Sequence, residues 1–130
     1  VLPLLETDIM DIIEAVWEEK LDTLDIKWSD KSCACVVMAS GGYPEKYETG
    51  KVISGLDENG QCEGAFVYHA GTKLEDGKFL TAGGRVLGIT AYGDTLKEAL
   101  DTAYKAVDTI SFEKAHYRHD IGKKALSALK

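Results

Sequence analysis

The chain has few cysteines, few prolines and no apolar run long enough to cross a bilayer. Its three cysteines are an odd number without the spacing of a disulfide framework, so we do not expect a disulfide-stapled, exported protein. A membrane span needs ~20 apolar residues, and residues 1–5 are too short and lack the basic flank of a signal peptide. We therefore expect a cytoplasmic location and no membrane partner.

Positive charge is also in short supply. The 130 residues include 15 Lys and Arg against 22 Asp and Glu, which gives a net charge of −7. Such a surface repels phosphate backbones, so we expect no nucleic-acid partner. A small anionic substrate is still compatible, because one arginine or a ring of backbone N–H groups acts at short range. The 45% hydrophobic share and the length predict one globular domain.

Two stretches have the apolar periodicity of amphipathic helices. The first begins after Thr7 or Asp8 and is predicted to end near residue 21, with a polar connector over residues 22–31. Its apolar side comprises Ile9, Ile12, Ile13, Val16 and Trp17. The second begins at Thr95, which has capping-box spacing to Glu98, and its apolar stripe extends to Ile110. A short helical run is expected at residues 124–129.

Several strands are expected between these helices. Residues 33–39 are apolar at every position, which predicts a central strand with both faces covered. Further strands are expected at 51–54, 65–70 and 85–92. Asp76 and Gly77 predict a hairpin turn between 72–74 and 78–81.

This order of elements predicts an α+β fold with a mostly antiparallel β-sheet and flanking helices. Within the single domain 1–130, residues 1–31 form a leading helix and connector. Residues 32–130 form the sheet with the C-terminal helices.

Two glycine pairs stand directly against strand-like runs. Paired glycines let main-chain N–H groups approach a ligand closely, and the fork of Arg85 suits a carboxylate or phosphate. We therefore predict a substrate-binding rim made of Ser40, Gly41, Gly42, Tyr43, Gly83, Gly84 and Arg85. The alternative interpretation is that both glycine pairs only form the turns next to the strands and bind no ligand.

No other constellation predicts catalysis or metal binding. The spacing of the cysteines and histidines matches no zinc pattern, and His69 has no third residue to orient it in a Cys–His nucleophile pair. Gly50-Lys51 is not a phosphate loop, because Glu45 stands where that motif needs glycine and Val52 where it needs Ser or Thr. We therefore assign no catalytic and no metal-binding residue.

An ordered set of motifs nevertheless resembles one known family. The stretches are VVMASGGYP at 36–44, GKVISGL at 50–56, HAGT at 69–72, GGRVLGITA at 83–91 and YRHDIG at 117–122. In order and spacing, over nearly the whole chain, they resemble the C-terminal region of the phosphoribosylamine–glycine ligases, also called glycinamide ribonucleotide synthetases. Each motif is weak by itself, and the ordered set is specific.

The resemblance implies an ATP-grasp ligase of de novo purine biosynthesis. That family joins glycine to 5-phosphoribosylamine to give glycinamide ribonucleotide, using ATP with Mg²⁺ or Mn²⁺ and a glycyl phosphate intermediate. By this resemblance the chain is the hybrid-like C-terminal domain, which packs on the ATP-grasp domain. The N-terminal substrate domain and the ATP-grasp lobes would be absent, so the chain by itself would be inactive and bind no cofactor. The rim residues would line the substrate side, with Arg85 neutralising a carboxylate or phosphate.

Two alternatives stay open at this point. One is a non-catalytic packing or binding module. The other is the equivalent domain of a different ATP-grasp enzyme, of the biotin carboxylase or carboxyaminoimidazole ribonucleotide synthase type. The sequence does not determine the oligomeric state, or whether the parent is a single enzyme or a fusion.

Overall fold

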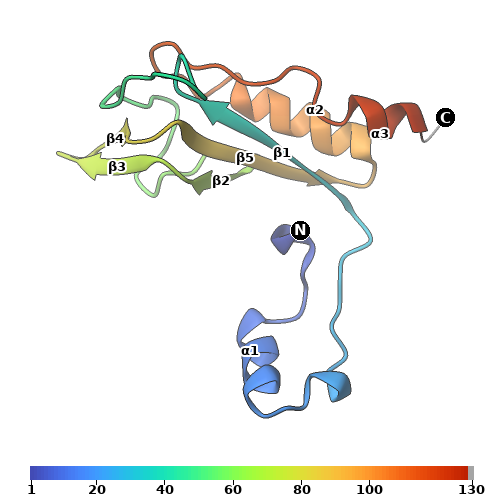
Figure 1. Cartoon of the computed structure of the whole chain (residues 1–130). Helices are drawn as coiled ribbons and strands as arrows, with labels where there is room; N and C mark the ends of the chain where they lie inside the picture. The colour runs from blue at the N-terminus through green and yellow to red at the C-terminus, as the bar shows by residue number, and fades with distance from the viewer. Residues whose placement is uncertain (129–130) are drawn as a thin grey trace.

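The computed structural model describes residues 1–128 and consists of a body and a projecting arm (Figure 1). The arm contains η1 (Leu2–Leu4), α1 (Ile9–Trp17) and η2 (Leu21–Thr23). The body contains β1 (Ser32–Ala39), β2 (Phe66–His69), β3 (Thr72–Glu75), β4 (Lys78–Thr81), β5 (Arg85–Gly93), α2 (Leu96–Val107) and α3 (Lys123–Ala128). This confirms the predicted α+β class with antiparallel strands and flanking helices. In the described part of the chain, no helix is long and apolar enough to span a membrane.

The main sheet has three antiparallel strands in the order β1-β5-β2. The prediction that residues 33–39 form a central strand covered on both faces is wrong, because β5 is central and β1 lies at the edge. Burial alternates along β1, where Val36 and Met38 are buried while Cys35 and Val37 are exposed. Within residues 1–128, a helix covers only one face of the sheet, so a continuous apolar run does not guarantee burial on both sides.

α2 covers the buried face of this sheet. Its start was predicted correctly, since Glu98 N–H donates to Thr95 Oγ1 and the Glu98 carboxylate accepts from Thr95 N–H. The helix packs mainly through small residues, among them Ala99, Ala103 and Ala106, which lets it lie close to β1 and β5. Val107 and Ile110 complete the core together with Val36, Met38, Leu87 and Ile89. α3 confirms the short terminal helix over residues 124–128, and Leu129 of that prediction lies outside the described residues.

β3 and β4 form a separate two-stranded sheet. Asp76 and Gly77 both have positive φ, 49° and 71°, as a two-residue hairpin turn requires. The hairpin prediction is therefore confirmed. The strand predicted at 51–54 does not form, and single bridges join Val52 to Leu80 and Ser54 to Ser111 instead. Gly55, at φ 89°, turns the chain away after Ser54.

The arm of residues 1–31 extends away from the body as a helix between two 3-10 turns (Figure 1). Asp8 accepts a hydrogen bond from Met10 N–H (2.8 Å), which confirms the predicted N-cap. The helix ends at Trp17, earlier than predicted, because Glu19 adopts a left-handed conformation with φ 58°. No residue of α1 is buried, and Ile9, Ile13, Val16 and Trp17 of its predicted apolar side are exposed, while Ile12 is partly buried.

Candidate functional site

The two glycine turns lie side by side at one end of the β1–β5 pair. Because the strands are antiparallel, the chain leaves β1 where it enters β5, and Ala39 pairs with Arg85. Ser40 N–H donates to the carbonyl of Gly84, and Ser40 Oγ donates to the carbonyl of Gly83, both at 2.8 Å. The structure thus brings together all seven residues of the sequence-predicted rim. The 2% exposure of Ser40 means that its hydroxyl joins the turns and does not face solvent.

Glycine is required here because the turns approach other groups closely. A Cβ on Gly84 would lie 2.2 Å from Cδ2 of Tyr43, so the tyrosine ring rests directly on the buried glycine. Gly42 has φ 96°, and a Cβ there would lie 2.2 Å from the carbonyl oxygen of Lys46. Tyr47 lies beside Tyr43, with ring centroids 6.1 Å apart. The glycines therefore shape the turns in addition to exposing their backbone.

Several hydrogen-bond donors of the rim are left unused. Within residues 1–128, the N–H groups of Gly41, Gly42 and Gly83 donate to no protein acceptor. The Arg85 side chain is exposed and forms neither a hydrogen bond nor an ion pair with any described residue. Backbone N–H groups next to a guanidinium suit an anion such as a carboxylate or a phosphate. These donors are of the kind that anion sites use, and anion binding at the rim stays a prediction.

A cluster of four charged residues borders the rim. Lys51 Nζ lies 3.0 Å from Glu113 Oε2 and 3.2 Å from Glu48 Oε2, and Lys114 Nζ lies 3.6 Å from Glu48 Oε2. The Lys51 hydrogen bond, followed by the charge of Lys114, lowers the pKa of Glu48. Hydrogen bonds from Lys51 to Glu113 and Glu48 raise the pKa of Lys51. Lys114 also packs against Gly41, so the cluster connects the first glycine turn to the segment after Phe112.

We expect the carboxyl of Glu48 to titrate below its ordinary pKa, and Lys51→Met to move it back upward, because Lys51 is the largest cause of the shift. A lowered pKa contributes stability that is present above the ordinary carboxyl pKa and is lost as the pH falls through the lowered value. Carbon-detected NMR titration of the side-chain carboxyls measures both midpoints. Lys78→Met, an exposed lysine on β4, is the matched control and should leave the Glu48 midpoint unchanged.

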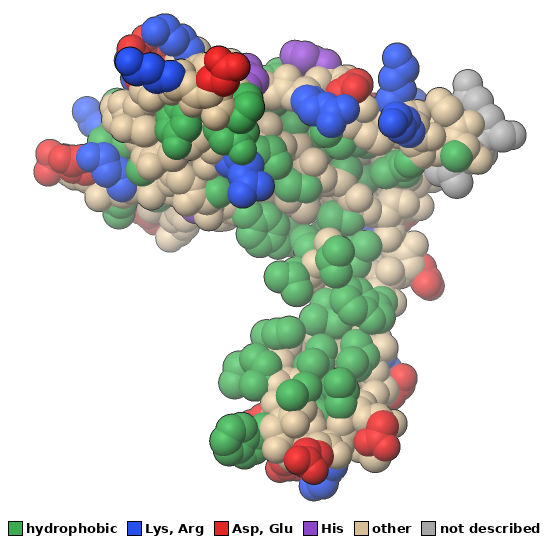
Figure 2. All heavy atoms as spheres, in the orientation of Figure 1, with side chains coloured by type: hydrophobic (Ala, Val, Ile, Leu, Met, Phe, Trp, Pro, Cys, Tyr) green, Lys and Arg blue, Asp and Glu red, His purple; other side chains and the backbone are tan. Residues whose placement is uncertain are grey.

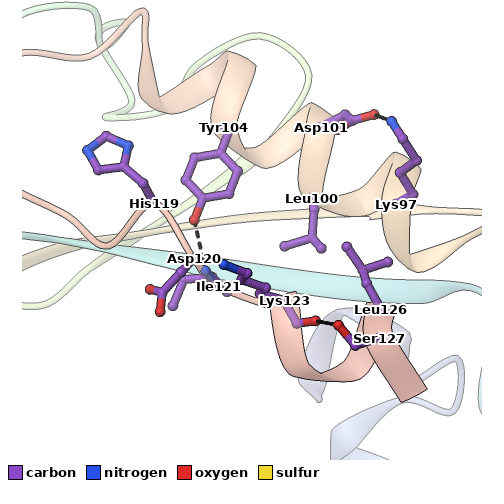
Figure 3. Close-up of a pocket in the computed structure, with 10 residues that line it drawn as sticks. All are labelled: Lys97, Leu100, Asp101, Tyr104, His119, Asp120, Ile121, Lys123, Leu126 and Ser127. Carbon is purple, nitrogen blue, oxygen red and sulfur yellow. Dashed lines mark hydrogen bonds and ion pairs between the residues drawn. The ribbon is translucent and has the colours of Figure 1, made fainter. Parts of the chain in front are cut away.

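A different surface holds the cavity drawn in Figure 3. This cavity, of about 480 Å³, lies between α2, α3 and the tail, as we call the segment 112–122 between these helices, and no residue of either glycine turn lines it. Tyr104 Oη donates to the Arg118 carbonyl (2.7 Å) and accepts from Ile121 N–H (3.1 Å), which fixes the tail against the helix. Sequence reasoning missed this site. The available signal was Tyr104, a large polar residue within the small-residue stripe of α2.

The histidines and cysteines form no site of their own in the described structure. Within residues 1–128, no group of three or more His, Cys, Asp or Glu is placed to hold a metal ion. Both ring nitrogens of His69 are occupied, one by Thr72 Oγ1 and the other by the Gly60 carbonyl, each at 2.8 Å. His69 therefore connects the loop before β2 to the start of β3.

Comparisons with known proteins give a consistent result. Residues 33–124 match the family model described as phosphoribosylglycinamide synthetase, C domain. The chain is 53% identical over 121 residues to a phosphoribosylamine–glycine ligase of Caldanaerobacter subterraneus, covering 93% of this chain and 28% of that protein. It is 47% identical to a bifunctional purine biosynthetic protein of Dictyostelium discoideum, covering 99% of this chain and 16% of that protein.

A solved structure is also similar. The crystal structure of a phosphoribosylamine–glycine ligase from Thermotoga maritima matches with a TM-score of 0.67 and 33% identity, over 84% of this chain and 27% of that one. The chain thus spans well under a third of the length of the relatives it matches.

Proposed function

Because this chain belongs to the phosphoribosylglycinamide synthetase C-domain family, we propose that it works as the C-terminal domain of an ATP-dependent ligase. That ligase joins glycine to 5-phosphoribosylamine to give glycinamide ribonucleotide, a step of purine synthesis that takes place in the cytoplasm. The observation that carries this proposal is the family match over residues 33–124, together with 53% identity to a named ligase. The same matches favour the glycine ligase over the equivalent domain of a biotin carboxylase or a carboxyaminoimidazole ribonucleotide synthase.

The chemistry of the ligase belongs to the part of the relatives that this chain does not span. Activation of glycine would require its carboxylate to be positioned against the γ-phosphate of ATP, and a metal ion would neutralise the phosphate charge there. The described residues do not fit ATP with Mg²⁺ or Mn²⁺, since they offer neither a phosphate loop nor a cluster of metal-binding side chains. We therefore assign the metal and nucleotide to the N-terminal substrate domain and ATP-grasp lobes, and expect this chain by itself to be inactive.

The rim supplies one wall of the substrate site in this proposal. Arg85 and the unused N–H groups of Gly41, Gly42 and Gly83 bind an anionic group, either the carboxylate of glycine or the phosphate of 5-phosphoribosylamine. Ser40 and Tyr43 hold the two turns together, Ser40 through its hydrogen bonds and Tyr43 by packing on Gly84. Because the rim is open to solvent, the opposite wall of the site must come from the ATP-grasp part.

A domain exchange tests the proposed function. This chain would replace the matching portion of the Caldanaerobacter ligase, and formation of glycinamide ribonucleotide would be followed with ATP, glycine and 5-phosphoribosylamine. We expect the exchanged ligase to retain activity within about tenfold of its parent, and the isolated chain to show none. A matched exchange with the Thermotoga portion serves as the control. A folded but inactive exchange beside an active control would contradict the proposal, as would amide formation by the isolated chain.

A further inference from the structure

A third segment joins the end of β1 beside the two glycine turns. Ala39 pairs with Arg85 of β5 on one side, and on its other side it forms a single antiparallel bridge to His116. In this bridge Ala39 N–H donates to the His116 carbonyl (2.8 Å), and His116 N–H donates to the Ala39 carbonyl (3.0 Å). Residues paired across antiparallel strands share a face, so Arg85 and His116 flank the small Ala39 on one face. His116 was not among the residues of the predicted rim.

The neighbours of Arg85 and His116 show which face this is. Val86, next to Arg85, is buried in the core that α2 covers. Ala115 and Tyr117, on either side of His116, pack against the same core. Because successive side chains of an extended segment point to opposite faces, Arg85 and His116 point away from α2, and both are exposed. Charged and histidine side chains gather over the loops where β1 ends (Figure 2).

The ring of His116 has donors to offer. Within residues 1–128 it forms neither a hydrogen bond nor an ion pair, whereas both ring nitrogens of His69 are occupied. An imidazole donates from one nitrogen when neutral and from both when protonated. The carboxylates of the charged cluster that borders the rim, Glu48 and Glu113, are already paired with Lys51. Among the described residues, the face beside Ala39 thus carries two basic side chains without an anionic partner.

Two basic groups suit a phosphate better than a carboxylate. The carboxylate of glycine has one charge, which the fork of a single arginine satisfies through two parallel hydrogen bonds. A phosphate monoester carries a charge of about −1.5 to −2 at neutral pH and has three terminal acceptor oxygens. Adjacent strands lie ~5 Å apart, so the main chains of Arg85 and His116 stand ~10 Å apart across Ala39. Both side chains together can bridge this gap through one phosphate.

We propose that His116 is a further substrate-binding residue, which together with Arg85 binds the phosphate of 5-phosphoribosylamine. This inference rests on the proposed function and deepens it, because the rim then receives this phosphate and not the carboxylate of glycine. Arg85 supplies a fixed charge and a two-pronged geometry. His116 donates from the opposite side of Ala39 to an oxygen that the fork leaves free. The unused N–H groups of the glycine turns are available to the third oxygen.

His116→Ala in the exchanged full-length ligase tests this inference. We expect KM for 5-phosphoribosylamine to rise about tenfold, because a hydrogen bond to a charged group is lost. We expect kcat and KM for glycine to change less than about twofold, since the lost contact binds ground state and transition state alike. His116→Gln keeps a hydrogen-bond donor and should recover part of the loss. The ring has no described partner, so the variants should unfold at the same denaturant concentration as the parent.

His119→Ala is the matched control. His119 is also an exposed histidine of the tail, but its ring stacks on Tyr117, with centroids 4.6 Å apart, and it lines the separate cavity of Figure 3. Its removal should leave both KM values unchanged. If KM for 5-phosphoribosylamine rises as much in His119→Ala as in His116→Ala, the effect does not come from the rim and the inference is wrong.

The double variant Arg85→Ala/His116→Ala shows whether the two residues bind one anion. Residues that share a partner have coupled effects, so the loss in kcat/KM should differ from the product of the two single losses by at least about threefold. Losses that simply multiply would mean that the two residues do not bind the same phosphate, which overturns the inference.

The remaining outcomes also decide it. An unchanged KM for 5-phosphoribosylamine in His116→Ala overturns the inference, as does a rise in KM for glycine alone. Binding of glycinamide ribonucleotide, which carries the same phosphate, is measured by calorimetry on the same proteins. If the exchanged ligase is inactive but binds this product more weakly after His116→Ala, the phosphate contact is kept and the proposed function fails. Activity that His116→Ala leaves unchanged does the reverse, and an inactive ligase whose product binding is absent or unchanged refutes both.

Discussion

Replacing Gly42 by alanine is expected to lower the free energy of unfolding by about 3 kcal/mol. Residues with a Cβ rarely adopt the φ of 96° found at this position. The new Cβ would also lie 2.2 Å from the carbonyl oxygen of Lys46. To relieve this contact, residues 42–46 would have to move. That movement would disturb the packing of Tyr43 on Gly84. Chemical denaturation of the isolated chain measures the loss.

Gly77→Ala is the matched control for this prediction. Gly77 also has positive φ, 71°, but a Cβ there would meet nothing within 4 Å. Only the conformational cost remains, about 1 kcal/mol. If the two variants lose equal stability, the close packing of the first glycine turn contributes nothing beyond its backbone angle, and our account of the rim is wrong.

Arg85→Ala in the full-length ligase is expected to lower kcat/KM by about 10- to 100-fold for the substrate whose anion it binds, while KM for ATP stays unchanged. The estimate follows from a hydrogen bond to a charged group, worth about 1.5–3 kcal/mol. Because Arg85 is exposed and pairs with no described residue, the variant should unfold at the same denaturant concentration as the parent. Steady-state kinetics with glycine and 5-phosphoribosylamine varied in turn shows which anion it contacts.

Two further variants sharpen this test. Arg85→Lys keeps the charge but loses the two-pronged geometry, so it should recover only part of the activity. Lys78→Ala removes an exposed cation beside the hairpin turn, where Lys78 pairs with Glu75, and should leave all kinetic constants unchanged. If Arg85→Ala leaves kcat unaltered and KM unaltered for both non-nucleotide substrates, Arg85 binds neither of them and the proposed role is wrong.

The sequence predicts those features that depend on local chemistry. Asp76-Gly77 adopts the positive φ values of a hairpin turn, and Thr95 with Glu98 forms both capping hydrogen bonds. These motifs act within a few residues, so their geometry hardly depends on the rest of the fold. The family resemblance was identified from ordered local motifs, and the family match over residues 33–124 confirms it.

The features that were predicted wrongly depend on neighbours distant in the sequence. The apolar run of β1 indicated a central strand, but whether Val37 is covered depends on which elements lie over the sheet. The end of α1 was placed too late, because the left-handed conformation of Glu19 has no signal in its residue type. Residues 51–54 lack a full partner strand, since Val52 forms a single bridge to Leu80 of the hairpin and Ser54 forms one to Ser111.

The sequence indicated the residues of the two glycine turns but not how the turns meet, and substrate binding by them stays a prediction. Paired glycines beside two strands pointed to the positions, and antiparallel pairing of β1 with β5 brings them together. That Ser40 uses its hydroxyl on Gly83, and that Tyr43 covers Gly84, follows only from tertiary packing. The cavity beside Tyr104 was missed for a related reason: its walls come from segments that meet only in the folded chain.

The central position of β5 also determines when this domain can fold during synthesis. Among the strands of the described structure, β1 and β2 each have β5 as their neighbour, and the residues of β5 leave the ribosome after theirs. Until residue 93 has emerged, β1 and β2 have no central strand to pair with. The helix that covers the buried face of the sheet, α2, is synthesised later still. Strand pairing between segments distant in the sequence is slow, and partly folded chains with unpaired strands are prone to aggregate. A pause in translation before β5 would therefore prolong the time for which both strands lack their partner.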